Sequence, residues 1–298
     1  MTAPPRPLIQ PGGPIASFFV AIVVGVIRAL PDGFRRGIAR GLAGLAFALG
    51  VRRRVALDNL RAAFPDWSDE ERRATARRAY RNLAEAALES LTSDQLSDSA
   101  LERAVVVDDW GALGRALDAG GVLIASAHLG SWELLAEVMA RRKVKVTAVV
   151  RPLEGAFNAR VVKARQDAGV ELILQRGALQ NMIKAVRRGR CVVQLIDQAL
   201  PPEAGVPVTF FGRVVPTAPA LSMTALRTKA PVFVALTARE NGALKFHFEG
   251  PIPVPSTGDH RADVTAHTAQ LTAIIERYVR RYPDQWLWLH RRWKHAAG

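Results

Sequence analysis

The chain has 298 residues, of which 49% are hydrophobic and 23% charged, so it can fold around a substantial core and is not intrinsically disordered. The 41 Lys and Arg against 27 Asp and Glu give a formal net charge of +14. That excess favours acidic or phosphate-bearing partners, but it does not choose among anionic lipid, nucleic acid and acidic protein.

The N-terminal quarter contains two short apolar segments with arginines around them. Residues 1–13 are rich in Pro and Gly and are expected to be disordered; the apolar segments follow at 15–27 and 41–51. A 13-residue helix is roughly 20 Å long, whereas the hydrocarbon core of a bilayer is about 30 Å thick. The pattern favours a helical hairpin that lies in one leaflet, with its arginines at the level of the lipid phosphates. The alternative is two core helices of a soluble domain, and a cleaved signal peptide is not favoured because no small-residue cleavage site follows.

The helical pattern continues from residue 14 to about 103. Ser68 followed by Glu71 has the spacing of a capping box, which predicts a helix that runs from there to about residue 91. We therefore assign 14–103 to an N-terminal, membrane-associating helical region that is integrated with the domain after it.

From about 104 to 250 the pattern changes to short strands that alternate with helices. Several of these strands are continuously apolar, as strands covered on both faces must be. The alternation predicts an α/β fold with a central, mostly parallel sheet flanked by helices over residues 104–298, ending in a helix at about 261–281. Cys191, the single cysteine, lies in one strand, so a buried structural thiol is favoured and no intramolecular disulfide or thiolate metal cluster is possible. The predicted strands are 122–126, 144–150, 171–174, 191–196, 231–238 and 243–249.

His128 stands at the carboxyl end of the apolar strand 122–126, the edge where ligands bind in open α/β sheets. Gly130 permits a tight turn, and Ser131 can cap a helix with Glu133 in its first turn. His128 and Glu133 would then meet across the corner, although on one continuous helix they would lie about 140° apart. A histidine with a carboxylate on its other nitrogen suits general-base activation of an alcohol.

Two residues at this spacing form a weak pattern by themselves. On these two residues alone a hydrogen-bonded structural histidine at a strand end is the better interpretation. Ser126 and Ser131 are interpreted as turn or capping residues instead of nucleophiles. Zinc is disfavoured because no His-Glu-x-x-His arrangement or third ligand is present, so no metal is expected.

Four further blocks join His128 and Glu133 in resembling the lysophospholipid acyltransferase-like superfamily, and within it the late (lauroyl and myristoyl) acyltransferases of lipid A biosynthesis. The resemblance runs from about residue 15 to the C-terminus, and the last block is its most specific part. The blocks are Arg151-Pro152 with Asn158 and Arg160, Asp197-Gln198, Phe210-Phe211-Gly212, and residues 285–294 (Gln-Trp-Leu-Trp-Leu-His-Arg-Arg-Trp-Lys).

The resemblance implies an acyltransferase on the cytoplasmic face of the inner membrane. It would move an acyl chain from acyl carrier protein or coenzyme A to a glycolipid hydroxyl, with no cofactor apart from that thioester co-substrate. His128 would be the general base and Glu133 its partner. Arg151 would hold a phosphate or the developing oxyanion, a role that a backbone N–H at Gly130 could share.

The resemblance leaves other roles open. Asn158 and Arg160 belong to the same substrate-binding block as Arg151. Asp197 would position an arginine, the acceptor or His128, or would cap a helix. Phe210 and Phe211 would line an acyl groove or pack in the core, and the tryptophans of the C-terminal block would be mostly structural.

Two rival functions remain. A non-catalytic basic membrane-binding protein fits the charge, whereas a nucleic-acid partner is not predicted because no recognition motif for one is present. An acyl-CoA-dependent enzyme of the same superfamily acting on another glycolipid or a lysolipid, such as a phosphatidylinositol mannoside, also fits. Chain length is not fixed, because one methylene changes binding by only about 1 kcal/mol.

Overall fold

The computed structural model describes residues 9–10, 13–107, 110–151 and 153–296. Most of the tail expected at 1–13 lies outside these ranges. The seven strands of the central sheet are β2 (Val105–Val107), β3 (Val122–Ser126), β4 (Val146–Val150), β6 (Glu171–Leu174), β7 (Cys191–Leu195), β10 (Val232–Glu240) and β11 (Ala243–Glu249).

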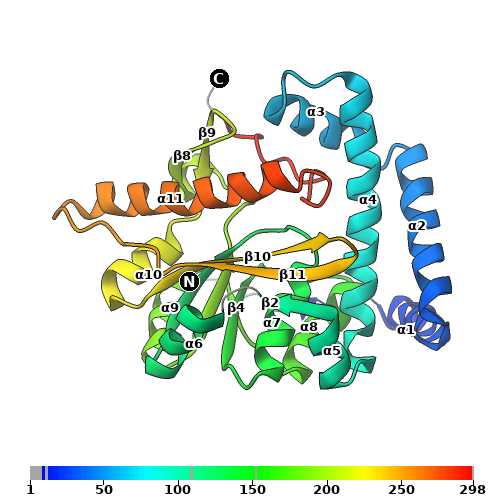
Figure 1. The fold of residues 1–298 in the computed structure, drawn as a ribbon, viewed down its shortest axis with the longest axis horizontal. Coiled ribbons are helices and arrows are strands. Elements are labelled where there is room, and N and C mark those ends of the chain that lie inside the picture. Colours follow the sequence, from blue (N-terminus) through cyan, green and yellow to red (C-terminus); the bar gives the residue numbers. More distant parts are fainter. Residues whose placement is uncertain (1–8, 11–12, 108–109, 152, 297–298) are drawn as a thin grey trace.

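The sheet has the order β2-β11-β10-β3-β7-β4-β6 (Figure 1). Five of its neighbouring pairs are parallel, and only β10 and β11 pair antiparallel. The predicted α/β fold with a mostly parallel sheet is therefore confirmed. All six predicted strands are present, with ends that differ by at most two residues.

Helices cover both faces of the sheet, which is why its central strands are continuously apolar. Along β3, Leu123 and Ala125 belong to one buried cluster, whereas Val122 and Ile124 belong to the other, as alternation along a strand requires. Cys191 is buried in the second cluster, and its burial raises the pKa of the thiol to about 12, so it is the inert structural thiol expected. The covering helices are α6 (Trp110–Ala119), α7 (Trp132–Arg141), α8 (Ala156–Asp167), α9 (Ala178–Arg187), α10 (Ala220–Thr228) and α11 (His260–Arg281).

The N-terminal region forms α1 (Pro14–Ala29), α2 (Asp32–Ala48), α3 (Arg53–Ala63) and α4 (Asp69–Thr92). α4 stands beside the sheet, and α1 and α2 lie on its outer side (Figure 1). Both hydrogen bonds of the predicted capping box between Ser68 and Glu71 are present. Judged by length and apolarity, none of the helices within the described ranges qualifies as a membrane-spanning segment.

Two arginines of the hairpin α1–α2 form ion pairs with the rest of the protein. Arg28 pairs with Asp94 at 2.7 Å, just beyond the end of α4, and Arg40 pairs with Glu85 of α4 at 2.6 Å. The sequence predicts these arginines at the lipid phosphates, whereas in the structure Arg28 and Arg40 attach the hairpin to the domain.

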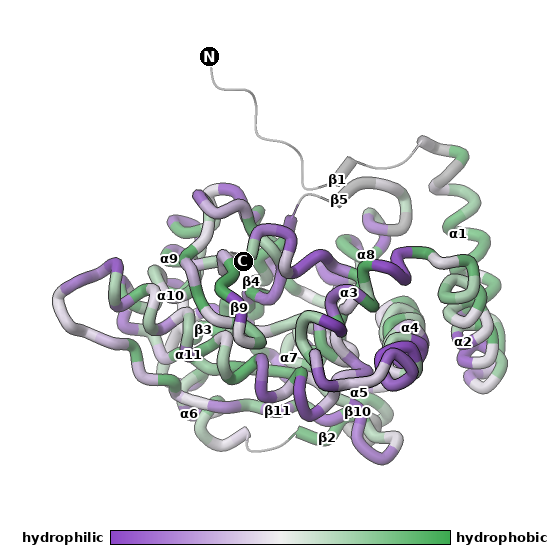
Figure 2. Tube along the Cα trace, turned by 90° about the horizontal axis from the view of Figure 1, so that it is seen from above, coloured by the Kyte–Doolittle hydropathy of each residue, from purple (hydrophilic) through white to green (hydrophobic). Residues whose placement is uncertain are grey.

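The opposite sides of α1 and α2 are apolar and exposed. Their exposed residues recur every three or four positions, so each helix presents one apolar stripe. In Figure 2 α1 forms a hydrophobic edge of the molecule. The exposed large side chains are Ile15, Phe18, Phe19, Ile22, Val23 and Val26 on α1, and Phe34, Ile38, Leu42 and Leu45 on α2.

A β-hairpin that the sequence did not predict follows the central strands β3, β4, β6 and β7 in the chain. β8 (Val206–Phe210) and β9 (Arg213–Thr217) pair antiparallel, and Phe211 and Gly212 form the two-residue turn between them. Both turn residues have positive φ, at 52° and 72°, as hairpin turns of this length require. The short strand β2 was also missed, as were β1 (Ile9–Gln10) and β5 (Leu153–Glu154), which pair in parallel.

Candidate active site

The register of two central strands brings His128 and Asp197 together. β3 and β7 are parallel neighbours whose last pair is Ser126 and Leu195. Each strand therefore continues for two residues, to His128 on one side and Asp197 on the other. Both side chains lie at the carboxyl edge of the sheet, where ligands bind in this fold class.

The carboxylate of Asp197 accepts three hydrogen bonds in a buried position. Oδ1 accepts from Nδ1 of His128 at 2.8 Å, and Oδ2 accepts from the backbone N–H of His128 at 2.9 Å and from Nε1 of Trp286 at 2.8 Å. Only 2% of the Asp197 side chain is exposed.

These contacts keep Asp197 ionised. Burial alone would raise its pKa, but the charge of His128 and the three N–H donors outweigh burial and lower the pKa to about 2. Since this value lies below the ordinary 3.8, ionised Asp197 stabilises the folded state above pH 3.8, and that contribution is lost as the pH falls through about 2.

The pairing determines the tautomer of His128. An ionised carboxylate only accepts hydrogen bonds, so Nδ1 of His128 carries a proton, and in the neutral imidazole Nε2 is then the nitrogen with the lone pair. Nε2 lies 3.0 Å from the side-chain nitrogen of Gln198, which donates to it. The free lone pair of a neutral imidazole is the atom that a general base needs.

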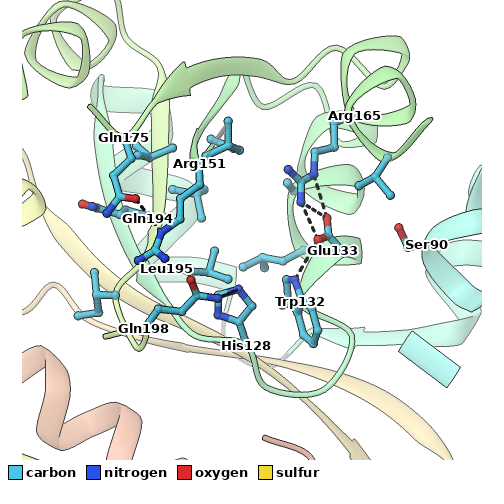
Figure 3. A pocket seen from close by; sticks show the side chains of 18 of the residues that line it. Ser90, His128, Trp132, Glu133, Arg151, Arg165, Gln175, Gln194, Leu195 and Gln198 are labelled. Carbon is cyan, nitrogen blue, oxygen red and sulfur yellow. Dashed lines mark hydrogen bonds and ion pairs between the residues drawn. The ribbon is translucent and has the colours of Figure 1, made fainter. Parts of the chain in front are cut away.

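Glu133 is not the residue that contacts His128. It lies in the first turn of α7, as expected, but its carboxylate accepts from Nε and Nη2 of Arg165 at 2.9 and 2.6 Å and from Nε1 of Trp132 at 3.0 Å. Figure 3 shows Glu133 and Arg165 on one side of the cavity and Arg151 and Gln198 on the other, with His128 between them. The predicted His128–Glu133 contact is therefore wrong for this structure, because the strand register puts Asp197 on Nδ1.

A cavity of about 390 Å³ opens beside His128. β4 and β7 pair only as far as Ala148 and Val193, and the residues just beyond this point line the cavity. Its walls are mostly apolar and come from α4, α7, α8 and β4. Polar groups are contributed by His128, Glu133, Arg151, Arg165, Gln194 and Gln198, among others.

The Arg151 block is only partly at the cavity. Arg151 lines it and donates to the side-chain oxygen of Gln175 at 2.9 Å and to the carbonyl of Ala199 at 3.2 Å. Asn158 also lines it from α8, whereas Arg160 on the same helix does not.

Phe210 and Phe211 pack in the core, which is the alternative to the acyl groove that the sequence left open. They are 1% and 5% exposed and are not among the residues that line the cavity. The ring of Phe210 lies 5.7 Å from those of Trp286 and Trp293. They are buried because the hairpin turn folds back onto the C-terminal aromatic residues.

Gly130 has a packing role and does not supply the predicted oxyanion donor. Its N–H donates to the carbonyl of Gln285 at 3.0 Å. It has φ of +57°, and a Cβ here would lie 2.4 Å from the carbonyl oxygen of Thr237. Ser131, at the N-cap of α7, makes no side-chain capping bond, and its hydroxyl instead donates to Glu89.

The C-terminal block contacts the residues that directly follow Asp197, which the sequence did not indicate. His290 Nε2 accepts from the backbone N–H of Ala199 at 2.9 Å, and Arg292 Nη1 donates to the carbonyl of Gln198 at 2.9 Å. Burial chiefly lowers the pKa of His290 to about 4, so this ring is neutral and can accept. The match of residues 285–294 to a family block was the available signal for these contacts. No such sequence signal existed for Arg165, because an arginine on an amphipathic helix is usually interpreted as a surface residue.

No group of three or more His, Cys, Asp or Glu side chains that could hold a metal ion occurs among the described residues. His128, with Asp197 on Nδ1, lies beside a mostly apolar cavity.

Comparison with known proteins identifies the family. The family model described as bacterial lipid A biosynthesis acyltransferase matches residues 11–295. The lipid A biosynthesis palmitoleoyltransferase of Escherichia coli (strain K12) is 25% identical over 246 residues, covering 82% of this chain and 79% of that protein. The lipid A biosynthesis lauroyltransferase of the same organism is 23% identical over 263 residues, covering 88% and 85%.

A solved structure was also found, the crystal structure of the 1-acyl-sn-glycerophosphate (LPA) acyltransferase PlsC from Thermotoga maritima. It aligns with a TM-score of 0.36 and 14% sequence identity over 85% of this chain and 99% of that chain.

The turn at Gly130 yields a first prediction. Gly130→Ala should destabilise the protein by roughly 1–3 kcal/mol and displace the His128 turn, because it combines a left-handed φ with a backbone clash. Chemical denaturation measures the loss. Gly212→Ala is the matched control, since Gly212 has φ of +72° but no atom within 4 Å of the added Cβ. An equal loss in both variants would contradict the role given to the Thr237 contact.

Proposed function

Because this chain belongs to the family of bacterial lipid A biosynthesis acyltransferases, we propose that it moves a fatty-acyl chain from a thioester to a hydroxyl of a lipid A precursor or a related glycolipid. The observation that carries the proposal is the ionised Asp197 on Nδ1 of His128, which leaves Nε2 as a base beside an apolar cavity.

His128 is the general base of the reaction. The acceptor hydroxyl takes the place of the Gln198 amide at Nε2 and gives its proton to that nitrogen as its oxygen attacks the thioester carbonyl. The tetrahedral intermediate collapses with cleavage of the C–S bond, and the imidazolium returns the proton to the departing thiolate. Asp197 stabilises the imidazolium and orients the ring, as the carboxylate of a catalytic triad does.

The two arginines at the cavity have different surroundings and different roles. Among the described residues Arg151 donates to the neutral oxygens of Gln175 and Ala199, so its charge is available to a substrate phosphate or to the developing oxyanion. Arg165 is neutralised by Glu133, and this ion pair forms a rigid polar wall that orients the acceptor. Asn158 contributes to the same binding surface, and Arg160 lies outside it.

The apolar part of the cavity takes the acyl chain. Small and branched side chains of α4 and α7 form its walls, including Leu83, Ala86, Ala87 and Leu135. The volume of about 390 Å³ is within the usual range of ligand pockets.

No cofactor is needed apart from the acyl thioester, whose carrier is acyl carrier protein or coenzyme A. The alternative is an acyl-CoA-dependent enzyme with a different glycolipid or a lysolipid as acceptor.

The apolar stripes of α1 and α2 rest on a lipid surface. They expose phenylalanine and aliphatic side chains side by side, and burial in the interfacial region of a bilayer removes this area from water. α1 packs against α8, which lines the cavity, so a lipid acceptor in that membrane is close to His128. We place the enzyme peripherally on the cytoplasmic face of the inner membrane.

The reaction is tested by mass spectrometry with purified protein in detergent. The protein is given a tetra-acylated lipid A precursor and acyl-carrier-protein or coenzyme A thioesters of several lengths. A new ester on the acceptor is expected, with a rate that falls by at least about 100-fold in His128→Ala because the base is lost. Transfer by the folded mutant at the wild-type rate would contradict the mechanism, and no transfer from either donor would favour another glycolipid.

The membrane surface is tested by sedimentation with phosphatidylglycerol-containing vesicles. Replacing Phe18, Phe19 and Phe34 by Ser should weaken binding by at least about 100-fold, since each phenylalanine contributes about 1.5–3 kcal/mol when buried. Val106→Ser with Val214→Ser is the control, because these valines are 41% and 44% exposed elsewhere on the protein. Unchanged binding by the triple variant would contradict the assignment.

A further inference from the structure

The C-terminal segment pairs directly with the turn that carries His128. Leu129 and Trp286 form an antiparallel bridge: the N–H of Leu287 donates to the carbonyl of His128 at 3.1 Å, and that of Gly130 donates to the carbonyl of Gln285 at 3.0 Å. This pairing fixes where the Trp286 side chain lies relative to the catalytic turn.

The indole N–H of Trp286 is placed on the same carboxylate as His128. Trp286 is 2% exposed, and its Nε1 donates to Oδ2 of Asp197 at 2.8 Å. That oxygen also accepts the backbone N–H of His128, while Oδ1 accepts the ring N–H. The indole therefore fixes the rotation of the carboxylate, and through it the direction of the imidazole.

We propose that Trp286 is a positioning residue for acyl transfer, which acts through Asp197 to hold the His128 imidazole in its reactive orientation and tautomer. The inference rests on the proposed function, in which His128 is the general base. It assigns to Trp286 a role in catalysis that its place in an aromatic core does not require.

The aromatic core supplies a matched control. The rings of Trp286 and Trp288 lie 4.7 Å apart in the same cluster, and Trp288 is fully buried. Its Nε1, however, donates to the carbonyl of Pro283 at 2.5 Å and not to Asp197. Tryptophan-to-phenylalanine substitution at either position removes one indole N–H and a similar amount of packing, but only Trp286→Phe changes the environment of Asp197.

The experiment compares Trp286→Phe and Trp288→Phe in the full-length protein. With a tetra-acylated lipid A precursor and lauroyl thioesters, Trp286→Phe should lower kcat by about ten-fold or more and leave KM little changed, because orientation and not binding is lost. Trp288→Phe should keep kcat near that of the wild type. Chemical denaturation of both variants measures the packing loss that they share.

The pH–rate profile separates positioning from packing. Without the indole donor the carboxylate interacts more strongly with a protonated His128, so the acidic limb should move to higher pH in Trp286→Phe only. Asp197 also faces the charges of Arg151 and Arg292 and the titratable ring of His290, and both variants leave all three in place. In an Asp197→Asn background, Trp286→Phe should cause little further loss of kcat, since the two residues act as one unit.

A second readout does not need turnover. Proton NMR should detect the N–H of His128 that is bonded to Asp197 as a downfield resonance, assigned by its loss in His128→Gln. Trp286→Phe should shift this resonance and Trp288→Phe should not. Equal kinetic losses in the two tryptophan variants, or an unshifted resonance in Trp286→Phe, would overturn the proposal. Absence of acyl transfer by the wild type with the NMR shift intact would instead contradict the proposed function.

Discussion

The carboxylate of Asp197 joins two loops and the C-terminal segment at one buried point. It accepts the ring and backbone N–H groups of His128 and the indole N–H of Trp286, and only 2% of its side chain is exposed. An ionised group at this depth is tolerated only when its hydrogen-bonding capacity is filled. The sheet register that sets residue 197 beside residue 128 is therefore the constraint on which the candidate active site depends.

α4 links the apolar hairpin to this centre. One of its sides lines the cavity through Leu83, Ala86 and Ala87. Glu85 pairs with Arg40 of α2, and Glu89 accepts the hydroxyl of Ser131, three residues beyond His128. The same helix therefore contacts the hairpin that we assign to the membrane and forms part of the wall of the proposed acyl pocket. It also contacts the turn that follows His128.

The sequence predicted the sheet and the position of His128 because apolar periodicity reports burial on both faces of a strand. The partner of His128 could not be predicted in the same way. Glu133 is five residues away in sequence and Asp197 is 69 away, and the choice between them depends on strand order, which no local pattern contains. The packing of Phe210 and Phe211 could not be predicted for a related reason. They belong to a hairpin whose side chains pack on the C-terminal tryptophans, more than 70 residues away in the sequence.

The central claim is that Asp197, and not Glu133, is the functional partner of His128. Steady-state acyl transfer by Asp197→Asn and Glu133→Gln, with folding verified for both, tests it most directly. We predict that Asp197→Asn lowers kcat by about 100-fold or more, because the wrong tautomer is favoured. Glu133→Gln should mainly raise KM for the acceptor, because Arg165 loses its anchor. A severe loss of kcat in Glu133→Gln, with near-normal kcat in Asp197→Asn, would contradict the account.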